Sequence, residues 1–390
     1  MLSIRSLYLR LAVLSTVVRG ASIGDDECGC YLTNGTNSAY YSQHKFFDFR
    51  DLGKYAGVPD VIKNASETGD ITSDYFESKD WDDSWGIQDW SNRKSGGVSL
   101  SGDASVLMVN SPNNIYIEKN EDNDAVSDTF LTMRTVRLKD FQTAAEFESV
   151  STYHYLSLRM LARVTGSAGA CMAMFTYLEG DELADVQEAD IEILTRDPKN
   201  RIQYTNQPSF TDDGDEVPKA TRNGTLPEGL SWDDWVVHRL DWTPSRSVWY
   251  VAGQEVASIE FQTPKDPAQV LFNAWSDGGS WSGNMSLNGA AYMQIQWIEM
   301  VYNGTDSEGS DKRSLEGRSG TGHVERRGML APREDDENGC KAVCSIDEVG
   351  EAGKTKVLWK SAASCVTAPI PRGWTTGLVV MGIMIMTWFV

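Results

Sequence analysis

The stretch Asp185-Val-Gln-Glu-Ala-Asp-Ile-Glu-Ile-Leu-Thr195 alternates acidic and apolar residues. On a β-strand, successive side chains point to opposite faces of the sheet. Glu188, Asp190 and Glu192 would therefore share one face, while the apolar residues between them enter a core. The pattern predicts a strand that is buried on one side only.

Three carboxylates in a row oppose one another's ionisation, so the row costs stability. Catalysis can use such crowding, because it keeps one carboxyl protonated as an acid while a neighbour stays ionised as a nucleophile. This pair is the machinery of glycoside hydrolysis, in which a retaining enzyme holds the two carboxyls about 5–5.5 Å apart. Since Cα atoms four residues apart on a strand are roughly 13 Å apart, the side chains must lean together. The alternative is a solvated strand face that is merely acidic.

Short runs rich in Val, Ile, Tyr, Phe and Trp recur around this stretch, separated by clusters of Gly, Asn and Asp. We predict strands over residues 155–164, 170–177, 189–194, 235–242, 247–251 and 292–302, with Gly253 at a hairpin turn. No amphipathic helices alternate with these runs, which argues against parallel α/β folds. The sequence predicts an all-β sandwich or jelly roll.

The chain has 390 residues, a net charge of −21, 41% hydrophobic and 10% aromatic residues, which is too apolar for a disordered acidic protein. Residues 22–305 hold 44 acids against 21 bases, a charge of −23. Such a surface repels phosphate backbones and anionic lipid head groups. Nucleic acid is therefore excluded as a partner.

Both ends of the chain resemble targeting segments. Residues 1–20 carry Arg5 and Arg10, an apolar run and small residues before Ala21, which predicts a secretory signal peptide, with a buried N-terminal helix as the alternative. Residues 374–390 are uncharged and follow small residues at 361–364, which predicts a GPI-anchor signal, or else a single-pass membrane helix. Residues 306–373 predict a polar linker and a disordered C-terminal stalk. We expect a secreted, extracellular protein at the cell surface or cell wall.

Five Asn-x-Ser/Thr sequons support passage through the secretory route and predict glycosylation at Asn34, Asn64, Asn223, Asn284 and Asn303. Disulfides are permitted there, but spacing alone does not fix the pairing of the six cysteines, Cys28, Cys30, Cys171, Cys340, Cys344 and Cys365. No His cluster accompanies them, so no zinc site is predicted. Arg326-Arg327 is either a dibasic processing site or a solvated charge pair.

The segment Glu188-Ala-Asp-Ile-Glu192 resembles the Glu-x-Asp-x-Glu signature of glycoside hydrolase family 16. The flanks are also similar to strands and a Trp-rich loop of that family: Leu158-Arg-Met-Leu-Ala-Arg163, Gly169-Ala-Cys-Met-Ala-Met-Phe-Thr-Tyr177, Trp235-Val-Val-His-Arg-Leu-Asp-Trp-Thr-Pro244, Trp249-Tyr-Val-Ala-Gly253 and Asn273-Ala-Trp-Ser-Asp-Gly-Gly-Ser-Trp-Ser-Gly283. The resemblance implies a concanavalin A-like β-jelly roll over most of residues 22–305.

The resemblance implies roles for the carboxylates: Glu188 as nucleophile, Glu192 as general acid/base and Asp190 as the assisting carboxylate between them. Ala189 stands where a larger aliphatic residue is commoner. No extra residue separates Asp190 from Glu192, a spacing that resembles lichenases, xyloglucan-active enzymes and fungal wall transglycosylases more than laminarinases. The family needs no cofactor; a structural calcium ion is compatible with it, although no ligand set can be named.

Aromatic side chains stack on the apolar faces of sugars, and we expect substrate-binding residues at Trp275, Trp281, Tyr204 and Asn206. Trp81, Trp85 and Trp90 are weaker candidates for the rim of the cleft. Trp242, Trp249 and His238 are expected to be structural, because buried aromatic residues dominate cores.

The sequence thus favours a retaining, endo-acting β-glycan hydrolase acting on a β-glucan or related cell-wall polysaccharide. One alternative is a wall transglycosylase, glucan–chitin or glucan–glucan, with the same site. Two others lack catalysis: a lectin-like binding protein, since the same sandwich serves lectins, and a wall-anchored structural glycoprotein.

Overall fold

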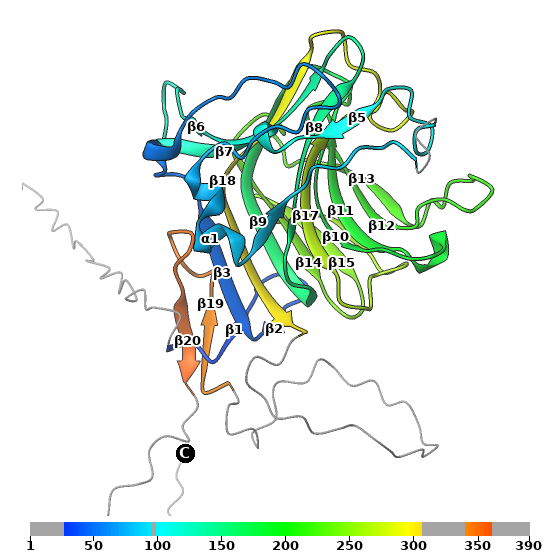
Figure 1. Ribbon diagram of the computed structural model, residues 1–390. Coiled ribbons are helices and arrows are strands. Elements are labelled where there is room, and N and C mark those ends of the chain that lie inside the picture. The colour runs from blue at the N-terminus through cyan, green and yellow to red at the C-terminus, as the bar shows by residue number, and fades with distance from the viewer. Residues whose placement is uncertain (1–26, 95–98, 306–339, 361–390) are drawn as a thin grey trace, which may run out of the picture.

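The computed structural model describes residues 27–94, 99–305 and 340–360 (Figure 1). These residues are almost entirely β-structure. Within them the α-helix is the short α1 (Lys79–Asp82), and the 3-10 turns are η2 (Gly53–Tyr55), η3 (Asp74–Glu77), η4 (Pro112–Asn114) and η5 (Leu183–Asp185). Figure 1 shows long, curved strands with the short helical turns at their periphery.

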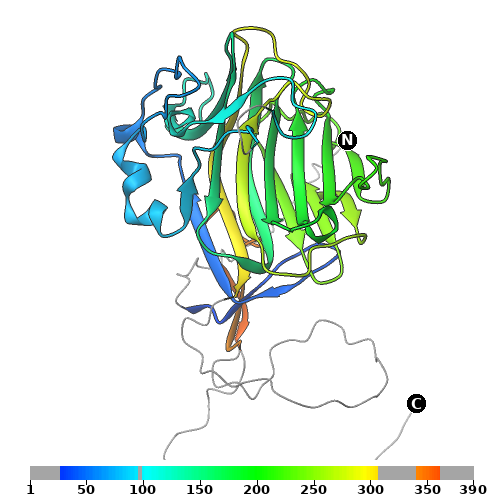
Figure 2. The same ribbon diagram turned by 45° about the vertical axis from the view of Figure 1, so that its right-hand side comes forward.

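Two strand layers form the body of the molecule. The first sheet, whose strands lie side by side in Figure 2, contains in spatial order β13 (Thr221–Thr225), β12 (Arg201–Gln207), β11 (Gln187–Leu194), β10 (Cys171–Leu178), β17 (Gln269–Trp275) and β8 (Gln142–Ser149). The second sheet contains β7 (Thr129–Arg137), β18 (Ala290–Gly304), β9 (Tyr153–Gly166), β14 (Val236–Trp242), β15 (Ser247–Val251) and β16 (Gln254–Ile259). Pairing of β7 with β8 joins the two sheets.

Four shorter strands extend this frame. β3 (Gln43–Asp48) pairs with β18, and β6 (Ile115–Lys119) pairs with β7. β4 (Trp85–Ile87) and β5 (Met108–Asn110) both pair with β8. The fold is therefore the expected all-β jelly-roll sandwich of the concanavalin A-like type.

The predicted strands are confirmed, each within a few residues of its expected ends. The turn at Gly253 is confirmed as well: Ala252 and Gly253, between paired Val251 and Gln254, have φ of +49° and +77°. Positive φ at both central residues defines a turn whose twist matches that of the flanking strands.

The core lies between the sheets and receives every second residue of the strands. On β11, Ala189, Ile191 and Ile193 are at most 1% exposed and belong to the main hydrophobic cluster. Leu240 and Trp242 enter the same cluster from β14. Burial of the odd-numbered residues of β11 turns its even-numbered residues to the opposite face.

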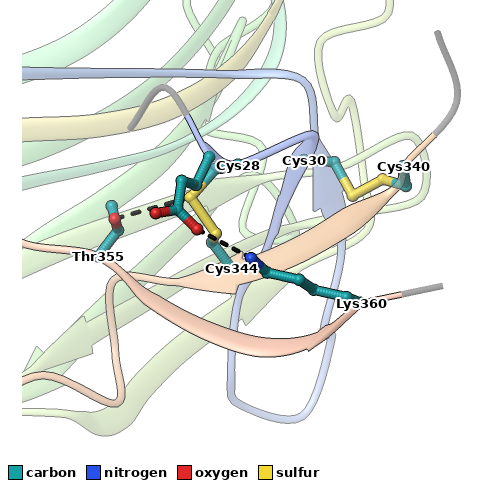
Figure 3. Close-up of a disulfide and its surroundings, with 7 residues drawn as sticks. Cys28, Cys30, Cys340, Cys344, Thr355 and Lys360 are labelled. Atoms are coloured by element: carbon teal, nitrogen blue, oxygen red, sulfur yellow. Dashed lines mark hydrogen bonds and ion pairs between the residues drawn. A yellow bond between two sulfur atoms is a disulfide. The ribbon is translucent and has the colours of Figure 1, made fainter. Parts of the chain in front are cut away.

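Residues 340–360 correct the prediction of a stalk over 306–373. They form β19 (Ala342–Ser345) and β20 (Lys356–Lys360), which join β1 (Cys30–Leu32) and β2 (Tyr40–Tyr41) in a separate four-stranded sheet, here called the clasp. Disulfides Cys28–Cys344 and Cys30–Cys340 tie its two ends together (Figure 3). The segment packs on the main domain, where Cys344 and Ile346 share a buried cluster with Val301 of β18.

A buried ion-pair network attaches the clasp to the second sheet. Asp347, just after β19, contacts Arg159 of β9 at 2.6 Å and Arg239 of β14 at 3.4 Å. Arg239 also binds Asp241 at 2.6 Å and donates to the side chain of Asn34 at 2.8 Å. The network thereby connects Asn34 and Asp347, which are more than 300 positions apart in the sequence, to the second sheet.

Several predictions concern residues outside the described ranges: the signal peptide 1–20, Arg326-Arg327, Cys365 and the hydrophobic tail 374–390. Within the described ranges, no helix has the length and apolar character needed to cross a membrane.

Candidate active site

The three acidic residues of β11 share one face, as the alternation predicted. β11 pairs with β10 on one side and β12 on the other, in both cases without a register shift. Glu188, Asp190 and Glu192 therefore stand in a straight row on the face opposite the core, at every second position of the strand.

A cleft of about 280 Å³ lies over this row and the neighbouring strands. Its lining residues come from the first sheet, from β5 and the segment before it, and from the loop after β17; they are Trp90, Asn92, Ser101, Met108, Asn110, Glu146, Ala173, Phe175, Glu188, Glu192, Asn273, Trp275 and Asp277. A larger hollow of about 640 Å³ lies beyond the end of β10 and the start of β11, but neither Glu188 nor Glu192 lines it. Because Glu188 and Glu192 line the smaller cleft, that cleft is the candidate active site.

Burial and mutual repulsion hold protons on the carboxylate row. Burial, with the charge of Glu192, raises the pKa of Glu188 from 4.5 to about 8. Burial also raises the pKa of Asp190 well above its ordinary value, reinforced by Glu192 and Glu188 on either side. The row does not carry three negative charges at neutral pH, because each ionised member disfavours the next.

Glu192 differs from the other two in accepting hydrogen bonds from an indole and a thiol. Burial raises its pKa, but the indole of Trp281 and the thiol of Cys171 oppose this rise. The Nε1 of Trp281 lies 2.8 Å from Glu192 Oε1, and the Sγ of Cys171 lies 3.4 Å from the same oxygen. Environments that differ between two nearby carboxyls are what acid–base chemistry requires.

A fourth carboxylate in the cleft escaped the sequence analysis. Glu146 of β8 is 7% exposed and accepts a hydrogen bond from Trp90 Nε1 at 2.7 Å. Burial raises its pKa, against hydrogen bonds from Trp90 and Asn273 that lower it. The signal was present in Ala145-Glu-Phe-Glu148, which alternates acidic and apolar residues as β11 does.

Two of the predicted aromatic platforms lie at the cleft. Trp275 lines it, and Trp281, which is 38% exposed, contacts Glu192. Trp90 also lines the cleft. Trp81 and Trp85 do not: both are 1% exposed and pack against Phe147 in the core, so their placement at the rim was wrong.

Tyr204 and Asn206 correct the prediction of substrate contacts on β12. Directly opposed residues of antiparallel strands lie on the same face, and Tyr204 pairs with Ile191 while Asn206 pairs with Ala189. Both therefore face the core, where Tyr204 packs against Trp249 and Asn206 donates to the carbonyl of Phe261. Sequence proximity to the catalytic strand was no guide, because the parity of the register decides the face.

The residues expected to be structural are buried. His238, Trp242 and Trp249 are fully buried. Burial lowers the pKa of His238 to about 4, so its ring is neutral near pH 7.

The sequons lie at the surface of the described chain, with four exposed acceptor residues, Asn34, Asn64, Asn223 and Asn284. Asn303 is half-buried, and its Oδ1 accepts a hydrogen bond from the backbone of Ser42. Glycosylation of these residues stays a prediction.

Of the residues that the structure describes, no group of three or more His, Cys, Asp or Glu side chains is arranged to hold a metal ion. The carboxylate row itself has the chemistry of proton transfer and nucleophilic attack.

Residues 109–299 match the model of the family "Glycosyl hydrolases family 16". The chain carries a family 16 domain. The match begins at β5 and ends within β18, so it includes the carboxylate row of β11 and most strands of both sheets.

A curated relative, the beta-glucanase of Fibrobacter succinogenes, is 27% identical over 184 residues, which cover 45% of this chain and 50% of the relative. The chain thus spans about half the length of the curated relative it matches. A Bacillus licheniformis beta-glucanase structure matches with 20% identity and a TM-score of 0.43, covering 56% of this chain and 92% of its own. LamA from Zobellia galactanivorans, in complex with laminaritriose and laminaritetraose, matches with 16% identity and a TM-score of 0.46, covering 67% and 99%.

Proposed function

We propose that this protein is a retaining, endo-acting β-glucan hydrolase. The observation that carries the proposal is the row of Glu188, Asp190 and Glu192 on one strand face, with both glutamates lining the same cleft. Membership of glycosyl hydrolases family 16 supports the reaction class, and the matched Fibrobacter succinogenes protein, named a beta-glucanase, supports the substrate class.

In the proposed reaction, Glu188 attacks the anomeric carbon in its ionised form, which the raised pKa of about 8 makes the minor form of the free protein at neutral pH. In the same step, protonated Glu192 gives its proton to the departing glycosidic oxygen. Glu192 then removes a proton from water, whose oxygen displaces Glu188 from the sugar. Asp190 assists: its raised pKa keeps it protonated, so it can donate a hydrogen bond to the ionised nucleophile and stabilise that charge. Two displacements return the configuration of the starting sugar.

The aromatic residues at the cleft support a sugar substrate. Trp90, Trp275 and Trp281 offer flat apolar surfaces on which pyranose rings stack, and Glu146 offers a hydrogen-bond acceptor to sugar hydroxyls. No Lys or Arg is among the residues lining the described cleft. The lining suits a neutral polysaccharide better than an anionic one.

A transglycosylase is the second candidate, since it would use the same glycosyl-enzyme intermediate and differ only in the acceptor. A sugar hydroxyl, from a second glucan or from chitin, would replace water in the second displacement. The distinguishing measurement is the product distribution: lengthened or mixed oligosaccharides favour transfer, and only shortened products favour hydrolysis.

We also infer that the protein is secreted and held at the cell surface by a lipid anchor, which rests on residues 1–20, the sequons and residues 374–390. The test is expression in a eukaryotic host. Release from the surface by phosphatidylinositol-specific phospholipase C supports the anchor, whereas retention with the tail intact favours a membrane helix.

The decisive experiment for the activity uses the full chain on β-1,3-, mixed β-1,3-1,4- and β-1,4-linked glucans. Proton NMR should detect the β-anomer as the first product, and both Glu188→Gln and Glu192→Gln should abolish turnover. Binding of glucan by the wild type with no turnover on any substrate would instead support the lectin-like alternative.

A further inference from the structure

The two oxygens of Glu192 have unlike surroundings. Oε1 receives the Trp281 indole N–H at 2.8 Å and the Cys171 thiol at 3.4 Å. The side chain of Glu192 makes no other hydrogen bond among the described residues, and it borders the cleft, so Oε2 is the oxygen left to meet a ligand. The carboxyl is thus held from one side and open on the other.

The two donors come from separate segments. Cys171 is the first residue of β10; it is fully buried and pairs with Trp275 of β17 and Leu194 of β11. Trp281 lies in the loop between β17 and β18. Convergence of a strand and a loop on one oxygen fixes the direction of the carboxyl plane.

The loop that carries Trp281 is itself fastened. The backbone N–H of Ser280 donates to Asp103 at 2.8 Å, and the N–H of Gly279 donates to Asp277 at 2.9 Å. The N–H of Gly283 closes the turn on the carbonyl of Gly279 at 3.0 Å. Trp281 is therefore presented to Glu192 from a defined loop, although its ring is partly exposed.

Both donors are neutral, and both remain donors across the working pH range. Burial raises the pKa of the Cys171 thiol well above its ordinary value, and the charge of Glu192 raises it further. An indole N–H has donor character only. Neutral donors bind an ionised carboxylate more strongly than a protonated one, so they stabilise Glu192 in the state that follows proton transfer.

The other titratable groups around Glu192 are carboxyls: Glu188 and Asp190 on its own strand, Glu146 on β8 and Asp277 in the loop after β17. On β12, Gln203 pairs with Glu192 and donates to Asp197. The residues lining this cleft in the described chain include no cation, so the two neutral donors are what offsets the negative charge.

We propose that Cys171 and Trp281 are positioning residues that hold Oε1 of Glu192, so that Oε2 is the atom that delivers and recovers the proton. The inference rests on the proposed function. The Oε2–H bond breaks and its proton joins the glycosidic oxygen as the C1–O bond breaks and Glu188 bonds to C1. In the second step a proton of water returns to Oε2, its oxygen bonds to C1, and the Glu188–C1 bond breaks.

The test removes one donor at a time. Trp281→Phe keeps a ring for stacking but loses the N–H; Cys171→Ala loses the thiol; Cys171→Ser restores a donor at the same position. The matched control is Trp90→Phe, which removes an indole N–H from a different carboxylate of the same cleft, Glu146. Circular dichroism melts exclude variants that do not fold.

For Trp281→Phe, the alkaline limb of kcat/KM on β-glucan should move to higher pH by roughly half to one unit, because an ionised carboxylate loses a donor. Cys171→Ala should give a smaller shift in the same direction, since a thiol is a weak donor, and Cys171→Ser should reverse it. Trp90→Phe should leave this limb in place.

A substrate with an activated aryl leaving group needs no proton from Glu192 in the first displacement, so kcat/KM for that substrate should be nearly unchanged in Trp281→Phe while kcat/KM on glucan falls about tenfold. An equal fall in kcat/KM on both substrates, without a shift of the limb, would show that Trp281 only stacks on sugar and would overturn the proposal.

A readout that needs no turnover separates this inference from the proposed function. The carboxyl carbon of Glu192, assigned with Glu192→Gln, can be titrated by NMR after labelling with ¹³C. A higher midpoint in Trp281→Phe supports the positioning role even if every tested glucan proves inert. An unchanged midpoint overturns it even in an active enzyme.

Discussion

The clasp and the cleft both bury ionisable side chains, but the clasp pairs opposite charges whereas the cleft places like charges together. In the clasp, Asp347 lies between Arg159 and Arg239, and the side chains of all three are at most 7% exposed. Burial acts to raise the pKa of Asp347, yet the two guanidinium groups lower it below its ordinary value. Opposite charges thus offset the cost of leaving water.

In the cleft, like charges are placed together and no cation is supplied by the lining residues of the described chain. The pKa values of Glu188, Asp190 and Glu192 all rise, chiefly because of burial. In this fold, a network of paired charges attaches the clasp to the second sheet, and a row of unpaired carboxyls lies at the candidate active site. The difference indicates which buried charges serve stability and which serve chemistry.

The largest expected effect comes from Glu188→Gln, which should lower kcat by roughly 10⁴-fold, as expected for loss of a nucleophile. Its melting temperature should stay equal or rise, because a buried carboxyl beside like charges is removed. Activity assays and calorimetry on the same sample check both. Asp185→Asn, an exposed acid three residues away, is the matched control and should change neither. A clear fall in the melting temperature of Glu188→Gln would show that Glu188 stabilises the fold, as the buried charges at the clasp do, and would contradict this comparison.

The two disulfides of the clasp should act together. Each closes a loop of more than 300 residues. While one is intact, the other closes only a short ring, so the chain-entropy model gives a loss of roughly 2 kcal/mol in the free energy of unfolding for either Cys28→Ala/Cys344→Ala or Cys30→Ala/Cys340→Ala. Removing all four cysteines should cost about 7–8 kcal/mol, because the loss of the loop of more than 300 residues adds to the loss of the short ring. Denaturant titrations measure the values, and simple addition of the two single losses would contradict the shared-loop account.

Asp347→Asn should lower the free energy of unfolding by about 3 kcal/mol, because Arg159 loses the buried partner of its ion pair. The kcat of the proposed enzyme should stay unchanged, since the clasp contributes no residue to the cleft lining. Glu348→Gln, an exposed neighbour, controls for the loss of charge alone. The paired change Arg159→Met/Asp347→Leu should restore part of the loss; no restoration would mean that the ion pair is not the source of the effect.

The smallest expected effect is a pH dependence of opposite sign at the two regions. Glu188 has its pKa raised from 4.5 to about 8, so its stabilising contribution is present below about pH 4.5 and is lost as pH rises through about 8. Asp347 has its pKa lowered from 3.8, so its contribution is present above that value and is lost as pH falls through the lowered pKa.

Unfolding curves from pH 3 to 9 check this sign. Between pH 4.5 and 8, Glu188→Gln should gain about 2 kcal/mol relative to the wild type, a partial share of the full shift. Over the same window, the free energy of unfolding of Asp347→Asn should run parallel to that of the wild type and below it. The difference between the two should shrink as the pH falls below 3.8. Parallel curves for wild type and Glu188→Gln would refute the buried-proton account of the cleft.

The sequence by itself determined the local features of this protein. The period-two alternation around Glu188, Asp190 and Glu192 was enough to predict the strand, its buried side and the acidic face, because side-chain direction on a strand follows from backbone geometry alone. The apolar runs and turn residues predicted the jelly roll in the same way. The five-residue motif and its flanks pointed to the family that residues 109–299 match.

Only the tertiary structure decided which other residues join that face. Tyr204 and Asn206 follow the catalytic strand closely in sequence, but the register with Ile191 and Ala189 turns them into the core. Glu146 and Cys171 reach the site from β8 and β10, and residues 340–360 return to pair with β1. These placements depend on strand order, register and long-range contacts, which no local pattern encodes, because the free energy that fixes them comes from burial between segments far apart in the chain.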